Sequence, residues 1–89
     1  MYYVYLLKSK KDGNYYIGQT NNVNGRLKRH NAGQVKSTKY RRPFMLIGSK
    51  TFKTRSEARW CEYNLKQHSD KKHKFIGELE VQFSKSEDG

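Results

Sequence analysis

The chain opens with two short runs of aromatic, β-branched and aliphatic residues separated by a polar stretch. Residues 2–7 read Tyr-Tyr-Val-Tyr-Leu-Leu and residues 15–18 read Tyr-Tyr-Ile-Gly, with the turn dipeptide Asp12-Gly13 between them. Residues of these types favour strands, and an Asp-Gly dipeptide between two such runs is typical of a hairpin turn. The pattern therefore predicts an antiparallel β-hairpin.

The expected register of this hairpin follows from its turn. If the turn has two residues, counting outward from it pairs Tyr5 with Thr20. Because side chains alternate between the two faces of a strand, Tyr3, Tyr5 and Tyr16 are then expected on one face of the sheet. Any chemistry that these phenols carry should lie on that face.

Residues 23–32 have the spacing of a helix with one inward face. Side chains suited to a core recur at helical intervals, namely Val23, Leu27 and His30. Asn21 or Asn22 can cap its start, and Gly33 supplies a stop. This segment predicts the first helix.

A polar stretch and a third strand follow that helix. Residues 34–43 are polar, end in proline and carry four cations around Tyr40, which is typical of a loop. Residues 44–47 are apolar, and the strand that they predict continues towards Phe52.

A second helix is predicted from its capping signal. Thr54 followed by Glu57 matches the capping box, and the helix extends to about His68. Its inward stripe consists of three residues, Ala58, Cys61 and Leu65. Trp60 and Tyr63 lie off that stripe.

The end of the chain has no single predicted structure. Residues 75–83 regain apolar character, and their spacing leaves strand, helix and loop open. Residues 84–89 are expected to be a disordered tail, so that residues 1–83 form the one domain. The fold class is α/β in the broad sense (α+β): a small three-stranded antiparallel sheet flanked by helices, in the order β-β-α-β-α with a C-terminal extension.

The charge of the chain indicates a polyanionic partner. Its 89 residues include 19 lysines and arginines against 8 aspartates and glutamates, a net charge of +11. Such an imbalance suits nucleic acid first, whereas a membrane partner is not expected because the chain has no long apolar run or signal-peptide-like segment. The cytoplasm is therefore the expected compartment.

The cysteine content limits the possible cross-links and metal sites. Cys61 is the only cysteine, so the chain has no internal disulfide and no cysteine-rich zinc site. Any metal ion must be bound through oxygen or imidazole ligands.

Two tripeptides on the predicted hairpin carry a family signature. The first is Tyr3-Val4-Tyr5 and the second is Tyr16-Ile17-Gly18. Together they resemble the signature of the GIY-YIG nuclease superfamily, with tyrosine in place of the first glycine. Within that superfamily the chain is similar to the short stand-alone proteins related to the UvrC N-terminal nuclease domain.

Two helical segments extend this resemblance over roughly residues 2–77. Arg26 follows Tyr16 by ten residues, inside a stretch from Gly25 to Gly33 that looks like the family's arginine helix. The stretch that ends in Glu62 looks like the family's metal-binding glutamate segment. The ordered combination is much more specific than any one piece.

The resemblance implies a division of catalytic tasks. Hydrolysis of a phosphodiester needs a positioned, deprotonated water and neutralisation of charge on the phosphoryl oxygens. By resemblance, Glu62 binds one Mg²⁺ or Mn²⁺ ion, Arg26 contacts the scissile phosphate, and Tyr16 or Tyr5 is the general base or positions the water. His30 lies one turn after Arg26, where both side chains could address a common phosphate or tyrosine oxygen.

Each of these residues also has an ordinary structural interpretation. Glu62 borders the inward stripe of its helix and could form an ion pair with a lysine or arginine. Arg26 alone could be a solvated charge, and His30 could be a satisfied histidine at the core edge. The tyrosines could simply fill a thin core, although Tyr5 and Tyr16 share both the motif and the predicted face.

The basic loop is the expected contact with the nucleic-acid backbone. Its cations alternate with hydroxyls and an aromatic ring, which suits phosphate contact and base stacking. The residues concerned are Lys36, Lys39, Tyr40, Arg41 and Arg42. The chain shows no recognition helix or zinc finger, so structure-specific cutting is expected rather than sequence-specific cutting.

The sequence hypothesis is a metal-dependent endonuclease acting on DNA, which is favoured over RNA, in repair or recombination. One alternative is a non-catalytic nucleic-acid-binding module, which would need the charge and the aromatics but not Glu62. Another is an adaptor in which the aromatics around Trp60 bind a protein partner.

Overall fold

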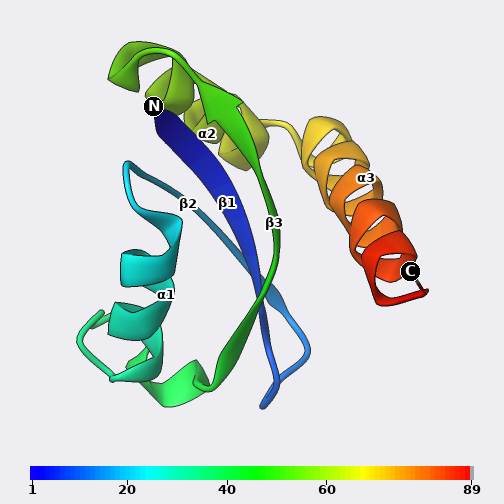
Figure 1. Cartoon of the computed structure of the whole chain (residues 1–89). Coiled ribbons are helices and arrows are strands. Elements are labelled where there is room, and N and C mark those ends of the chain that lie inside the picture. The colour runs from blue at the N-terminus through cyan, green and yellow to red at the C-terminus, as the bar shows by residue number, and fades with distance from the viewer. Residues whose placement is uncertain (89) are drawn as a thin grey trace.

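The computed structural model describes residues 1–88, and the side chains of residues 1–85. Its element order is β-β-α-β-α-α, with a short 3₁₀ turn before the third strand (Figure 1). The bounds are β1 Tyr2–Ser9, β2 Tyr15–Thr20, α1 Val23–Asn31, η1 Lys39–Arg41, β3 Phe44–Phe52, α2 Arg55–Gln67 and α3 Ser69–Asp88. The predicted α+β class, with three antiparallel strands in one sheet, is confirmed.

The strand β1 lies in the middle of the sheet, between β2 and β3. Its residues alternate between two hydrophobic clusters. Val4 and Leu6 belong to one cluster and Tyr5 and Leu7 to the other. The sheet therefore has two buried faces. The edge strand β2 has no neighbouring strand on its outer side.

Different helices cover the two faces of the sheet, as Figure 1 shows. Val23 and Leu27 of α1 pack with Tyr5 and Leu7. The other cluster contains side chains of α2 and α3, namely Ala58, Leu65, Phe75 and Leu79. The predicted inward residues of the first two helices are confirmed, with Cys61 packed at the edge of its cluster.

The hairpin register differs by two residues from the expected one. Tyr5 pairs with Gly18, where a two-residue turn would have paired it with Thr20. The loop is longer because the Ser9 hydroxyl accepts hydrogen bonds from the amides of Lys11 and Asp12, both at 3.1 Å. A shift of two residues keeps every side chain on its face.

The helix boundaries follow the predicted caps. The Asn22 side chain accepts a hydrogen bond from the Gly25 amide at 3.0 Å. Gly33 has a φ of +77°, the left-handed conformation that ends helices and that glycine adopts without steric cost. At α2, the Thr54 hydroxyl accepts from the Glu57 amide at 3.2 Å.

The C-terminal region is helical, which the sequence left undecided. Phe75 and Leu79 are buried one turn apart, at 3% and 2% exposure, and both face β3 and α2. A Cβ atom added at Gly48 of β3 would come within 3.2 Å of Leu79, so the glycine lets α3 approach closely. The helix continues through residue 88, where the sequence led us to expect a disordered tail over residues 84–89; residue 89 lies outside the described residues.

None of the helices within residues 1–88 is long and apolar enough to span a membrane.

The packing of α3 predicts a large loss of stability on truncating its inner face. Phe75→Ala should lower the free energy of unfolding by about 3–5 kcal/mol, because it removes a buried aromatic ring and leaves a cavity. The matched change Val81→Ala, on the same helix at 54% exposure, should alter it by less than about 0.5 kcal/mol. Urea unfolding followed by circular dichroism measures both, and equal small effects would show that α3 does not pack on the sheet.

Candidate active site

The hydroxyl of Tyr5 lies at the centre of the candidate site. Tyr5 is 1% exposed, and its ring covers Gly18 on the neighbouring strand. A Cβ atom at position 18 would lie within 2.6 Å of the Tyr5 ring, closer than side chains approach. The glycine of the second tripeptide therefore makes room for the tyrosine of the first.

A chain of hydrogen bonds runs from Tyr5 into the core. The Tyr5 hydroxyl is 3.1 Å from Nε2 of His30, and Nδ1 of His30 is 2.8 Å from the Thr38 hydroxyl. The Thr38 hydroxyl donates to the carbonyl of Val35 at 3.4 Å, so it accepts from His30 Nδ1–H. Nε2 is then the acceptor for the Tyr5 proton, and His30 is a neutral imidazole.

Burial sets the protonation of both groups. Desolvation, assisted by the charges of Arg26 and Arg29, lowers the pKa of His30 to about 4. Desolvation also raises the pKa of the Tyr5 hydroxyl, and the charge of Glu62 acts in the same direction, whereas the adjacent Arg26 guanidinium opposes it. His30 is 0% exposed, so the structure places it behind Tyr5 and away from any substrate.

Arg26 lies one turn before His30, and its guanidinium opposes the rise in the pKa of the same Tyr5 hydroxyl that His30 contacts. Arg26 is partly buried beside Tyr5, and its Nε atom is buried with no hydrogen-bond partner among the described residues. A guanidinium with unused donors in a protected position is suited to an anionic ligand. The solvated-charge interpretation of Arg26 does not fit this position.

Glu62 reaches the same site around the edge of the sheet. Its helix packs on the face opposite α1, and β2, which both the Tyr16 ring and the α2 contacts share, is an edge strand. The Glu62 carboxylate accepts from the Lys66 ammonium at 2.9 Å, and that ammonium lies 5.9 Å from the ring centroid of Tyr16 on the α1 face. The expected ion pair of Glu62 therefore exists, and it lies at the site.

Tyr16 is the more accessible of the two motif phenols. It is half-buried, and its ring centroid is 6.3 Å from that of Tyr5 and 4.9 Å from that of His30. The predicted common face of these tyrosines is confirmed. The Tyr5 hydroxyl is used inside the protein, so Tyr16 is the phenol available to a ligand.

The donor set for a metal ion is small. Within residues 1–88, no three His, Cys, Asp or Glu side chains come together in a group that could hold one. Glu62 is the carboxylate at the site, and Tyr16 offers a phenol oxygen nearby. Such a set fits Mg²⁺, which keeps several waters and uses one or two carboxylates together with phosphate oxygens of the substrate.

The basic loop is more structured than its sequence suggests. Arg41 donates to Asp12 at 2.7 Å, which together with the Asn14 amide lowers the pKa of Asp12 to about 2. Tyr40 is 75% exposed and has the Lys39 ammonium 4.9 Å from its ring centroid. The loop residues Lys36 and Tyr40 remain open to a ligand, whereas Arg41 fastens the loop to the hairpin.

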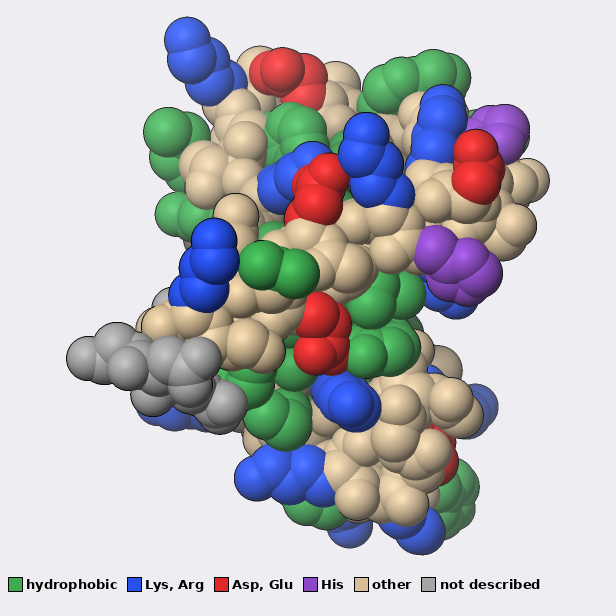
Figure 2. Space-filling view, turned by 90° about the vertical axis from the view of Figure 1, so that its right-hand side faces the viewer, with side chains coloured by type: hydrophobic (Ala, Val, Ile, Leu, Met, Phe, Trp, Pro, Cys, Tyr) green, Lys and Arg blue, Asp and Glu red, His purple; other side chains and the backbone are tan. Residues whose placement is uncertain are grey.

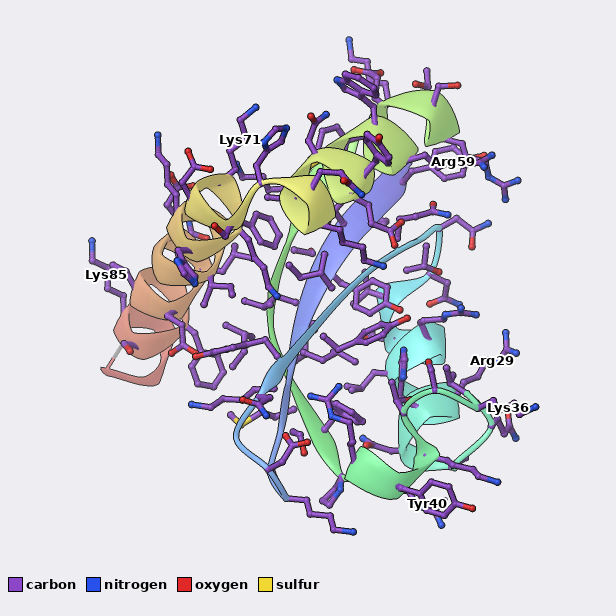
Figure 3. All side chains as sticks on the ribbon, turned by 180° about the vertical axis from the view of Figure 1, so that it is seen from behind. Arg29, Lys36, Tyr40, Arg59, Lys71 and Lys85 are labelled. Atoms are coloured by element: carbon purple, nitrogen blue, oxygen red, sulfur yellow. The ribbon has the colours of Figure 1, made fainter. Side chains whose placement is uncertain are left out.

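The positive charge is concentrated away from α3. Residues 1–68 hold fifteen of the 19 basic residues and three of the 8 acidic ones, a net charge of +12, whereas residues 69–89 carry −1. On the α3 side of the molecule, acidic and basic side chains are interleaved (Figure 2). Figure 3 shows Arg29, Lys36, Tyr40 and Arg59 together on one side, with Lys71 and Lys85 on the other.

The structure brings in side chains that sequence reasoning missed. Thr38 fixes the orientation of His30, Lys66 contacts both Glu62 and Tyr16, and Arg55 and Arg29 line a groove with Arg26. Arg55 and Lys66 could have been found from helical spacing, because they lie seven residues before and four after Glu62. Thr38 gave no signal, since its contact with His30 depends on how the loop folds.

Comparisons with known proteins show which sequences the chain resembles. The family model of the GIY-YIG catalytic domain matches residues 1–75. The chain is 45% identical over 69 residues to a UPF0213 protein of Staphylococcus haemolyticus, covering 76% of this chain and 83% of the relative. It is 43% identical over 79 residues to a UPF0213 protein of Staphylococcus saprophyticus, covering 86% and 95%.

A solved structure has the same fold. The solution structure of a UPF0213 protein from Bacillus halodurans is 38% identical in sequence to this chain and superposes with a TM-score of 0.54. The alignment covers 89% of this chain and 85% of that one.

The neutral, buried His30 predicts a loss of stability in mild acid. Its pKa falls from 6.5 to about 4 on folding, so the unfolded state binds the extra proton between these values. The contribution of the neutral His30 to the free energy of unfolding should therefore be fully present above pH 6.5. The free energy of unfolding should fall by about 3 kcal/mol as the pH drops to about 4. In urea unfolding across this range, the free energy of unfolding of His30→Gln should depend less steeply on pH than that of the parent.

His73→Gln, at an exposed histidine of α3, serves as the control. Its free energy of unfolding should depend on pH as that of the parent does. If the parent and His30→Gln lose stability in parallel between pH 6.5 and 4, the buried neutral histidine is ruled out.

Proposed function

Because this chain belongs to the family of GIY-YIG catalytic domains, a family of endonuclease-type hydrolases, we propose that it hydrolyses phosphodiester bonds of DNA in a metal-dependent reaction. The observation that carries the proposal is the position of three different groups at the edge of β2. A phenol from the hairpin, a guanidinium from α1 and a carboxylate from α2 lie around one small region of that edge.

Arg26 is the proposed ligand of the scissile phosphate. Its side chain lines a polar groove, where the charged guanidinium suits hydrogen bonding to a phosphoryl oxygen. A charged donor fixed before the reaction stabilises charge that develops on phosphate oxygens, and removing one such donor typically costs about 10²–10³ in rate.

Tyr16 is the proposed residue that positions the attacking water and the candidate general base. Tyr5 is less suited to this task, because its hydroxyl is buried and donates its proton to His30. Tyr5 and His30 are proposed as positioning residues that hold the Tyr16 ring and Arg26 in place. This assignment decides between the two phenols that the sequence left open.

Glu62 is the proposed ligand of one Mg²⁺ or Mn²⁺ ion, with Tyr16 as a possible further oxygen donor. When bound, such an ion stabilises negative charge on the phosphoryl and leaving oxygens. Lys66 now neutralises the carboxylate. We propose that the Lys66 ammonium leaves the Glu62 carboxylate when the ion binds and stays near Tyr16.

The proposed substrate is branched, flapped or nicked DNA, in repair or recombination in the cytoplasm. The cations support backbone contact, and DNA is favoured over RNA as the starting point for assays. A non-catalytic nucleic-acid-binding module is the second candidate, because the excess of positive charge alone would suffice for it.

A cleavage panel with flap, fork, single-stranded and duplex DNA tests the proposal. Glu62→Gln and Arg26→Ala should each lower the single-turnover rate by at least about 10²-fold, because each removes charge stabilisation specific to the transition state. Labelled DNA resolved on gels measures the rate with Mg²⁺ or Mn²⁺. Glu78→Gln, at an exposed carboxylate of α3, should cut like the parent.

DNA binding by Glu62→Gln, measured by fluorescence anisotropy, should survive. If neither the parent nor the variants cut any substrate while DNA binding is intact, the result would favour the binding module.

The Glu62–Lys66 pair predicts a change in metal requirement. Lys66→Met keeps the aliphatic stem and frees the carboxylate, so the Mg²⁺ concentration for half-maximal rate should fall about 2- to 5-fold, as expected for a pair worth at most about 1 kcal/mol. A Mg²⁺ titration of the cleavage rate measures this, with Lys74→Met as the control. An unchanged or higher requirement would argue against metal binding at Glu62.

A further inference from the structure

Beside the catalytic edge, a polar groove of about 430 Å³ lies between the first turns of α1 and α2. Three arginines line it, Arg26 and Arg29 from α1 and Arg55 from α2, together with polar residues that include Asn21 and Asn22. Among the side chains of residues 1–85, no acidic one contributes to the lining. The groove is thus a concave surface with one sign of charge, which attracts anions.

The arginines of this groove are not neutralised by the protein. The ion pairs found within residues 1–85 involve Arg41, Lys50 and Lys66, and none of them involves the three groove arginines. The Nε atom of Arg26 is buried without a partner. Three cations that line one hollow repel one another, and a bound anion would relieve that repulsion.

The guanidinium groups are the charged donors of the groove. The amide of Gly25 in the first turn of α1 is already occupied by the Asn22 side chain at 3.0 Å. Arg55 is held by the ring of Tyr2, whose centroid lies 5.7 Å from its guanidinium carbon. A planar guanidinium fixed in this way suits two-pronged hydrogen bonding to phosphate.

The groove continues the proposed active site along α2. Arg55, Arg59, Glu62 and Lys66 follow at intervals of four, three and four residues, which places them on one stripe of the helix. Arg55 precedes Glu62 by seven residues, about 10 Å along the axis at 1.5 Å per residue. A strand that lies along this stripe would therefore pass from the groove to Glu62.

We infer that this groove is a second phosphate-binding site, in which Arg55 and Arg29 hold the backbone of the cleaved strand next to the scissile phosphate that Arg26 binds. The inference rests on the proposed function, which supplies the strand and the position of the cut. It assigns a role in substrate binding to two residues outside the catalytic groups. The groove thereby sets a minimum length of strand on one side of the cut.

Binding measurements test the groove independently of cutting. In a Glu62→Gln background, adding Arg55→Ala or Arg29→Ala should weaken binding of a labelled single strand about 5- to 20-fold and lower the salt slope by about one. Lys71→Ala, at an exposed lysine on the other side of the molecule, should leave both values near the parent's (Figure 3). Fluorescence anisotropy over a range of salt concentrations gives both quantities.

A scan of neutral phosphates locates the contact. Methylphosphonates placed one at a time within four positions of the mapped cut, on either side, should weaken binding most at one phosphate close to the cut and on one side of it. The Arg55→Ala protein should no longer respond to that substitution, since its partner is gone. Arg55→Lys should restore part of the affinity.

The outcomes separate the groove from the proposed function. If the parent cuts DNA but Arg55→Ala and Arg29→Ala bind like Lys71→Ala, the groove inference is overturned and the nuclease proposal stands. If binding depends on these arginines and on one methylphosphonate position fixed relative to the end of the strand, but nothing is cut, the groove is supported and the nuclease proposal fails. Thermal unfolding of each variant shows that the fold is intact.

Discussion

The arrangement of the site depends on one buried hydroxyl, that of Tyr5. This oxygen lies between the central and edge strands, and it can lie there only because residue 18 has no side chain. A buried hydroxyl needs a partner, and a neutral His30 on α1 provides it. The contact fixes α1 against the sheet and brings Arg26, one turn before His30, to the same edge. The two family tripeptides thus act together as parts of one packing unit.

The edge strand explains how helices on opposite faces contribute to one site. A carboxylate on the helix opposite α1 would be remote from the phenols if a central strand lay between them. Because β2 is at the edge, Lys66, which pairs with Glu62, reaches past it to Tyr16. The small sheet is therefore part of the proposed catalytic arrangement, and α3, which adds no net positive charge, serves mainly to cover the other face.

Local signals in the sequence predicted most of the fold, and the misses have physical reasons. The caps at Asn22 and Thr54 act over a few residues, so the first two helices could be placed from the sequence. The hairpin register could not, because the Ser9 hydroxyl stabilises a longer loop than the Asp-Gly dipeptide suggests. In residues 75–83 the alternation of Leu79 with its neighbours resembles a strand, and its packing against Gly48 favours the helix.

For the site, the sequence identified the groups with a family pattern, and the structure added those that depend on tertiary packing. His30 proved to be the buried partner of Tyr5, and Arg55 joins Arg26 only when two helix starts meet.

The central claim, that Tyr16, Arg26 and Glu62 surround one metal-assisted phosphate, can be tested in a chain of 10.6 kDa by paramagnetic relaxation in NMR. Mn²⁺ is titrated into isotope-labelled protein bound to an uncut strand with a phosphorothioate at the cleavage position. The account predicts that the signals of these three residues broaden together while those of α3 persist. Broadening centred on α3 or the hairpin tip, with Glu62 and Tyr16 unaffected, would contradict it.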